Sequence, residues 1–201
     1  MIKNFGLLMG VDWNSNNWSD VSTEEDLKMS DFGFVQENAL TYSCLNFGHL
    51  QYPADKDGYY CGLLPQLWSK TLDRDKALHV QIVFLKSKDY TSGKTFIIGF
   101  YAYPVFQRGT WPSPISSFTS DFVYNVKSKP EHIHLCENYL DITNPEVQKY
   151  ILPRGKDLGT RGFNYLGKQE ALRIFDRLGE INKGDGKLNR IKLSLIRTTV
   201  A

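Results

Sequence analysis

The residues of this sequence best suited to chemistry are aromatic rings that stand beside side-chain amides. Trp13 and Trp18 lie five residues apart in the polar stretch VDWNSNNWSD, directly after an apolar segment. A second aromatic run, IIGFYAYPVFQRGTWPSP, begins as an apolar strand and ends among glycine and prolines. Rings of this kind stack on nucleic-acid bases, and asparagine amides can hydrogen-bond to base edges. The pattern predicts a base-binding pocket formed by Trp13, Asn14, Trp18, Tyr101, Tyr103, Phe106 and Trp111.

A structural interpretation of the same rings stays open. One tryptophan can plug the end of a β-barrel while the neighbouring asparagines form turns. A third irregular aromatic segment, with Tyr59, Tyr60 and Trp68, favours binding, because three such segments occur together. We expect at least two of the rings to border one open pocket, drawn from Trp13, Trp18, Tyr101, Tyr103 and Trp111.

The exit of the second aromatic run is expected to leave the sheet. In a strand, Tyr101 and Tyr103 share one face and Phe100 takes the other. Gly109 and the prolines that follow Trp111 predict a loop that joins no β-ladder.

Basic residues gather in the last quarter of the chain. Residues 149–201 carry 12 Lys and Arg against 5 Asp and Glu, a balance of +7, and residues 1–148 carry −5. The glycine-rich stretch PRGKDLGTRGFNYLGK lets backbone N–H groups approach a phosphate, although glycines and lysines are also typical of a surface turn. The predicted phosphate contacts are Arg108, Arg154, Lys156, Arg161 and Lys168.

Motifs of the common enzyme classes are absent from the sequence. It has no G-x-S-x-G, no Walker A loop, no H-E-x-x-H and no G-x-G-x-x-G. His132 and His134 are expected on one strand face, but no third ligand stands at a fixed spacing, so no metal site is predicted. We expect no cofactor and no catalysis within these residues.

Cysteine usage and hydropathy predict a location. Cys44, Cys61 and Cys136 are odd in number and form no C-x-x-C motif, which is typical of thiols in a reducing cytoplasm. No run of 18 apolar residues occurs, so no membrane partner is expected.

Most of the predicted elements that position the candidate site residues are strands. Apolar or alternating segments predict strands at 2–11, 78–87, 95–106, 120–128, 131–140 and 188–196. Helices are predicted after Ser22, which stands at capping-box spacing from Glu25, and at 144–152 with Asn144 as cap. A further amphipathic helix at 168–179 is expected to bury Leu172, Phe175 and Leu178 and to end at Gly179.

The order of these elements predicts the fold class. Strands with few, short helices do not alternate as βαβ units. We therefore expect one α+β domain over residues 1–201, a curled mixed or antiparallel β-barrel of five to six strands with short helices at its ends.

The central strands resemble those of PUA-like domains of the EVE and YTH kind. Gly99 corresponds to the glycine of their hydrophobic-Gly step, residues 101–112 to their variable loop, and Pro130 with residues 132–135 to their last element. The resemblance implies a PUA-like fold that binds nucleic acid and holds a single modified base in an aromatic cage. Related domains are the N-terminal specificity modules of modification-dependent restriction systems of the McrBC and HNH types. Residues 32–76 form an insertion that the resemblance does not cover.

The predicted function is a specificity module that flips a modified base, expected to be methylated, out of duplex DNA. Cleavage would then belong to a downstream nuclease domain or partner subunit, with this chain as the N-terminal part of a longer one. Two alternatives stay open: an RNA-binding auxiliary domain of an RNA-modifying enzyme, and a module whose aromatic groove takes a peptide. The sequence alone does not decide which modification is read, or between DNA and RNA.

Overall fold

The chain folds around a mixed sheet of five strands. The structure, a computed structural model, describes residues 4–38, 41–67, 79–115, 121–158 and 163–198. The sheet has the order β8-β4-β3-β1-β9, and β1 and β3 run parallel while the other neighbours are antiparallel. Its strands are β1 (Gly6–Gly10), β3 (Ile82–Lys88), β4 (Thr95–Ala102), β8 (Ile133–Asp141) and β9 (Asn164–Leu166). The α+β class is confirmed.

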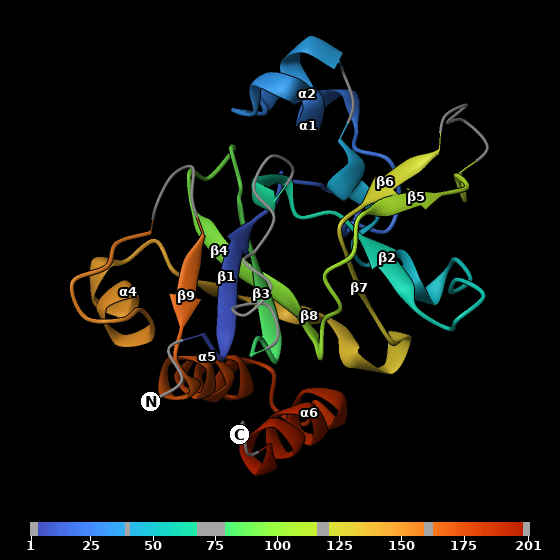
Figure 1. Cartoon of the computed structure of the whole chain (residues 1–201). Helices are drawn as coiled ribbons and strands as arrows, with labels where there is room; N and C mark the ends of the chain where they lie inside the picture. The colour runs from blue at the N-terminus through green and yellow to red at the C-terminus, as the bar shows by residue number, and fades with distance from the viewer. Residues whose placement is uncertain (1–3, 39–40, 68–78, 116–120, 159–162, 199–201) are drawn as a thin grey trace.

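Two small ladders, five α-helices and four short 3-10 helices complete the described part of the chain (Figure 1). The ladders pair β2 (Tyr60–Gly62) with β7 (Val126–Ser128), and β5 (Gly109–Trp111) with β6 (Phe122–Tyr124). The α-helices are α1 (Glu24–Met29), α2 (Gly33–Asn38), α4 (Pro145–Ile151), α5 (Lys168–Ile181) and α6 (Gly186–Arg197). None of the helices in these residues is long and apolar enough to cross a membrane.

Alternating side chains build a core on each face of the sheet. Leu8, Phe84 and Phe100 belong to one buried cluster, together with residues of α5 and α6. Leu7 and Val83, their neighbours along the strands, belong to the other cluster, with Trp18, Phe47 and Tyr60. Adjacent residues of a strand point to opposite faces, so each apolar run fills both cores.

The helix at 168–179 is confirmed, with two corrections. Its buried residues are Ala171, Ile174, Phe175 and Leu178, whereas Leu172 is half-buried. The helix continues through Gly179 to Ile181, because Asn182 provides the cap and its N–H donates to the Leu178 carbonyl. In Figure 1, α5 and α6 lie together at one end of the sheet, and α1 and α2 lie at the opposite end.

The predicted last strand, 188–196, is wrong, because these residues form helix α6. Asp185 caps it by accepting a hydrogen bond from the Leu188 N–H at 2.9 Å. The buried residues Leu188, Ile191 and Leu195 follow a helical spacing, and Leu193 is 53% exposed. The apolar residues of this segment fit both the two-residue period of a strand and the 3.6-residue period of a helix. The helix, which Asp185 caps, is the arrangement that buries them.

No closed barrel forms among the described strands, whose edges in the main sheet are β8 and β9. Residues 120–128 give two short strands, β6 and β7, instead of one. The prediction that Gly109 and Trp111 join no ladder is also wrong, since they pair with Tyr124 and Phe122. The PUA-like barrel therefore stays a prediction.

Gly99 is required by a close approach between strands. The ladder of β4 is irregular between Ile97 and Gly99, and a Cβ at position 99 would collide with the His134 carbonyl oxygen and lie 2.7 Å from the Phe47 ring. We expect Gly99→Ala to lower the free energy of unfolding by about 1–3 kcal/mol. Urea denaturation measures this. Gly186→Ala, at the start of α6, is the matched control, because an added Cβ there meets nothing within 4 Å, and it should raise stability slightly, by up to about 1 kcal/mol.

Candidate functional site

Three of the predicted base-binding residues are structural parts of the core. Trp18 and Tyr101 are each 1% exposed, and Asn14 is 2% exposed. The Asn14 side chain organises its loop, because its oxygen accepts from the Asn16 and Trp18 N–H groups and its nitrogen donates to the Asp20 carbonyl. The Tyr101 hydroxyl donates to a buried backbone carbonyl. These residues are poorly placed to reach a ligand.

The remaining predicted rings are half-buried and pack against two different clusters of the core. Trp13, Phe106 and Trp111 pack against the cluster that contains Trp18. Tyr103 packs against the opposite cluster, so the prediction that it shares a face with Tyr101 is wrong. Strand β4 ends at Ala102, and Tyr103 takes a positive φ of 49°, which turns its ring away from the strand's alternation. Neither described pocket is lined by more than one of the predicted residues, so base binding by the set stays a prediction.

The predicted phosphate contacts also separate. Arg154 and Lys156 are exposed on the turn that follows α4. Lys168 instead donates to the carbonyls of Ile196 and Thr198, where it caps the end of α6. Arg108 is exposed, and Arg161 lies outside the described residues.

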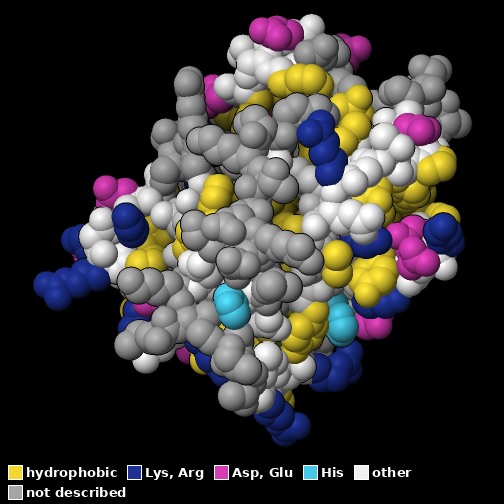
Figure 2. All heavy atoms as spheres, viewed as in Figure 1, with side chains coloured by type: hydrophobic (Ala, Val, Ile, Leu, Met, Phe, Trp, Pro, Cys, Tyr) yellow, Lys and Arg dark blue, Asp and Glu magenta, His cyan; other side chains and the backbone are white. Residues whose placement is uncertain are grey.

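A large cleft lies where β1 and β3 end, under α2. It has a volume of about 1080 Å³. We call it the α2 cleft. Its described lining comes from the ends of β1 and β3 and from residues 31–35. Tyr42, Gln66, Tyr90 and Leu158 also line it. Figure 2 shows hydrophobic side chains exposed near α1 and α2 at the top of the molecule, with a basic side chain below them. Pockets of this size hold whole small ligands in other proteins.

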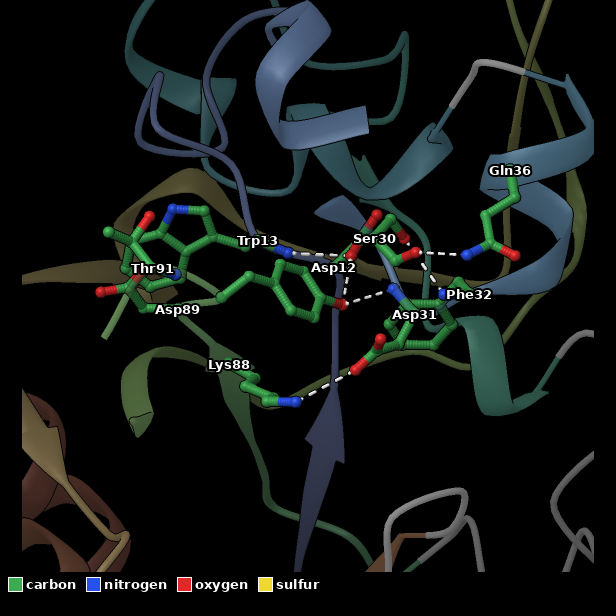
Figure 3. A network of polar contacts seen from close by, with 10 residues as sticks. Asp12, Trp13, Ser30, Asp31, Phe32, Gln36, Lys88, Asp89 and Thr91 are labelled. Atoms are coloured by element: carbon green, nitrogen blue, oxygen red, sulfur yellow. Dashed lines mark hydrogen bonds and ion pairs between the residues drawn. The ribbon is translucent and has the colours of Figure 1, made fainter. Parts of the chain in front are cut away.

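The floor of the α2 cleft carries buried polar groups. Asp12 is 3% exposed, and its carboxylate accepts hydrogen bonds from the Trp13 N–H at 3.1 Å and the Tyr90 hydroxyl at 3.0 Å. The Tyr90 hydroxyl in turn accepts from the Asp31 N–H at 3.1 Å, and Lys88 reaches the Asp31 carboxylate at 3.0 Å. Figure 3 shows this network, with Asp12 between Trp13 on one side and Ser30 and Asp31 on the other.

Burial shifts the pKa of two groups on this floor. It raises the pKa of the Asp12 carboxyl to about 6, despite hydrogen bonds from Ser30 and Tyr90 that favour the charged form. Burial lowers the pKa of Lys86, which is 8% exposed and pairs in register with Gly10 of β1. A buried carboxylate that costs stability at neutral pH and lines a large cleft is typical of a functional site.

The raised pKa of Asp12 predicts a pH-dependent gain from Asp12→Asn. The folded state binds the Asp12 proton more tightly than the unfolded state, so the carboxyl's contribution is fully present below pH 4 and is lost as the pH rises through about 6. Asparagine keeps an acceptor for Trp13 and Tyr90 but cannot ionise. We expect Asp12→Asn to be more stable than the wild type at pH 8 by up to about 3 kcal/mol, and the advantage to disappear near pH 4. Urea denaturation at both pH values measures this, and an advantage that does not change with pH contradicts it.

Aromatic rings form the rim of the α2 cleft. Phe34 is 49% exposed, and its ring centroid lies 6.2 Å from that of Tyr42 with the planes tilted by 32°. Phe32 and Tyr90 are half-buried and also line the cleft. These rings offer apolar faces to a flat ligand.

Gln66 supplies an unsatisfied polar group. Its Oε1 is buried and has no hydrogen-bond partner. Its Nε2 lies 3.0 Å from the position that a Cβ on Gly10 would take, so the amide lies directly over the end of β1. A buried amide atom without a partner costs free energy unless a ligand or water satisfies it.

Other candidates are weaker. A smaller hollow of about 140 Å³ beside α1 includes Trp13 and Asp26. No group of three potential metal ligands occurs among the described residues. His132 lies in a 3-10 turn before β8 rather than on the strand with His134, and the His134 Nε2 contacts the capping Asp185 carboxylate at 2.7 Å, which ties β8 to α6.

Sequence reasoning missed the α2 cleft. Its rings lie in residues 32–76, which showed only a turn-rich aromatic composition, and in the 88–94 hairpin turn. The aromatic residues Phe34 and Tyr42 in that unplaced segment were the available signal. Comparison with known proteins adds nothing to this picture, since no family model, curated protein or solved structure matches the chain.

Proposed function

We propose that this chain is a nucleic-acid-binding specificity module that holds one base, flipped out of duplex DNA, in the α2 cleft and selects a modified base there. The α2 cleft carries the proposal, because aromatic rings form its rim and buried polar groups form its floor. The rings stack on the base, and the floor reads what the base presents. The Trp18 and Tyr101 region, where the sequence predicted the pocket, contributes the scaffold instead.

In such a module, the free energy that base flipping costs is close to the free energy that stacking on the rings returns. Flipping a base costs a few kcal/mol, and each aromatic stack returns roughly 1–3 kcal/mol. Phe34 and Tyr42 therefore offset most of the cost for any base. A small additional gain from a substituent then decides which base stays bound, and selection needs no catalysis. Cleavage in such a system belongs to a nuclease domain or partner subunit.

A basic turn borders the cleft. Leu158 lines the α2 cleft, and the exposed Arg154 and Lys156 stand just before it on the same turn. Gly155 takes a positive φ of 74° between them, which bends the turn tightly. Phosphates that flank a flipped base would meet both cations here.

The experiment is a binding panel at two salt concentrations. Duplexes that differ only in one base (unmodified, methyladenine, methylcytosine or hydroxymethylcytosine) are compared with matched RNA by fluorescence anisotropy. We expect one modified duplex to bind most tightly and all affinities to fall steeply with salt. Equal affinity for all duplexes contradicts base selection. Preference for RNA supports the auxiliary-domain alternative, and a lack of salt dependence supports a peptide groove.

The basic turn gives a separate prediction. Replacing Arg154 and Lys156 together by alanine should weaken every duplex alike and reduce the salt slope by about two, one for each phosphate that is no longer neutralised. Salt titrations of the wild type and the variant measure both quantities. The matched control replaces Lys183, in the turn between α5 and α6, and Arg190 of α6, which are both exposed. An unchanged slope in the Arg154 and Lys156 variant, or an equal loss in the control, contradicts a phosphate contact at this turn.

A further inference from the structure

We propose that the substituent read in the α2 cleft is a bulky, neutral, hydroxyl-rich group, so that the preferred ligand is a base that carries a glycosyl group rather than a methyl group. This inference rests on the proposed function and names the class of modification.

The size of the cleft supports a large substituent. Its volume of about 1080 Å³ reaches the upper end of the roughly 300–1,000 Å³ that enclose drug-sized ligands. A methylated base fills only a small part of that space. Gly10 and Gly33 both line the cleft and contribute no side chain to that space.

The unsatisfied amide of Gln66 supports a hydroxyl-rich substituent. Oε1 is buried and has no hydrogen-bond partner. A side-chain amide can rotate to exchange its donor and acceptor ends, so Gln66 can offer either end to a ligand. A hydroxyl group both donates and accepts and therefore satisfies either end, whereas a methyl group satisfies neither.

The charges of the cleft support a neutral ligand. Two acids, Asp12 and Asp31, and two lysines, Lys86 and Lys88, line its described part. Asp31 and Lys88 pair with each other at 3.0 Å. With equal numbers of both signs, the cleft favours no charged ligand, while its carboxylate, ammonium and amide groups hydrogen-bond well to hydroxyls.

The order of side chains from the rim to the floor of the α2 cleft suits a base that is linked to a sugar. Phe34 and Tyr42 stand at the rim, where a flipped base arrives first. Asp12 and Lys86 are buried on the floor, beside the Gln66 amide that lies over Gly10. A substituent that extends from the base edge would pass the rings and reach these groups.

The test compares four duplexes that carry cytosine, methylcytosine, hydroxymethylcytosine or glucosyl-hydroxymethylcytosine at one position. We expect the wild type to bind the glucosylated duplex at least about tenfold more tightly than the methylated one. Gln66→Leu should reduce that preference by between about fivefold and a hundredfold, the range expected when one hydrogen-bonding partner is removed. Affinity for the methylated duplex should fall less than affinity for the glucosylated duplex. Gln169→Leu, the same change on the exposed surface of α5, is the matched control.

The outcomes separate this inference from the proposed function. Equal or weaker binding of the glucosylated duplex overturns the inference, and the proposed function survives if removal of the Phe34 and Tyr42 rings still weakens binding of the methylated duplex. If those rings affect no duplex, both fail. Displacement of the glucosylated duplex by free methyl glucoside, at concentrations near that duplex's Kd, also overturns the inference, because it indicates a site for sugars alone. Thermal unfolding confirms that Gln66→Leu is folded.

Discussion

Replacing Trp18 by alanine is expected to lower the free energy of unfolding by about 3–5 kcal/mol, the range for a buried aromatic side chain. Trp18 is 1% exposed, and its indole N–H donates to the Asp12 carbonyl at 2.7 Å. Its ring meets those of Trp13, Phe47 and Tyr139 at centroid distances of 5.4, 6.4 and 6.0 Å. Its removal leaves a cavity between the sheet and the loop that precedes α1. Urea denaturation measures the decrease in stability.

A matched control separates a role in the core from a role in binding. Trp111 is half-buried, so Trp111→Ala should cost clearly less stability than Trp18→Ala. If Trp18→Ala keeps its stability and loses selectivity for a modified duplex, the original prediction of a base pocket around Trp18 is right, and the α2 cleft is not the binding site.

Removing both rim rings is expected to abolish most duplex binding. With Phe34→Ala and Tyr42→Ala combined, affinity for the preferred duplex should fall at least about tenfold, because each stacked ring contributes roughly 1–3 kcal/mol. Phe34 is half exposed and contributes little to the core, whereas Tyr42 packs on Phe122 with ring centroids 5.5 Å apart. Some loss of stability is therefore expected from Tyr42→Ala. Anisotropy titrations at a temperature well below the unfolding midpoint measure the affinity.

Two controls accompany the double variant. Phe34→Leu keeps apolar bulk without a flat ring, and it should lose most of the affinity that Phe34→Ala loses. Leu50→Ala changes a side chain that is 86% exposed and should change nothing. Full affinity in the double variant contradicts a base site at this rim.

The main sheet could be predicted from the sequence where pattern and burial agree. The apolar runs around Leu85 and Phe100 form adjacent strands joined by the predicted hairpin, and Asn144 caps α4 as expected. The first helix begins one residue later than predicted, because Thr23 and Asp26 make the capping box. Residues 188–196 were predicted as a strand because their apolar residues fit two periods, and the Asp185 cap together with packing against α5 selects the helix.

The candidate site was less predictable for a physical reason. Whether a tryptophan faces solvent depends on what packs around it. The sequence around Trp18 is polar and therefore suggests an exposed loop, but the Asn14 side chain accepts hydrogen bonds from the backbone of that loop, which lets the loop be buried. The α2 cleft combines groups far apart in sequence, such as Asp12, Gln66 and Tyr90. An amide oxygen without a partner, as in Gln66, has no sequence pattern at all.

The most direct test of the central claim is a comparison of two NMR spectra of the chain, one bound to the preferred modified duplex and one bound to its unmodified counterpart. Contacts to the phosphates are common to both complexes, so the differences in amide chemical shift report the base alone. If the base binds in the α2 cleft, the chemical-shift differences are expected to be concentrated at residues 10–12, 31–35 and 86–90, with none around Trp111. Differences confined to Trp111 and its neighbours, or no differences at all, would contradict it.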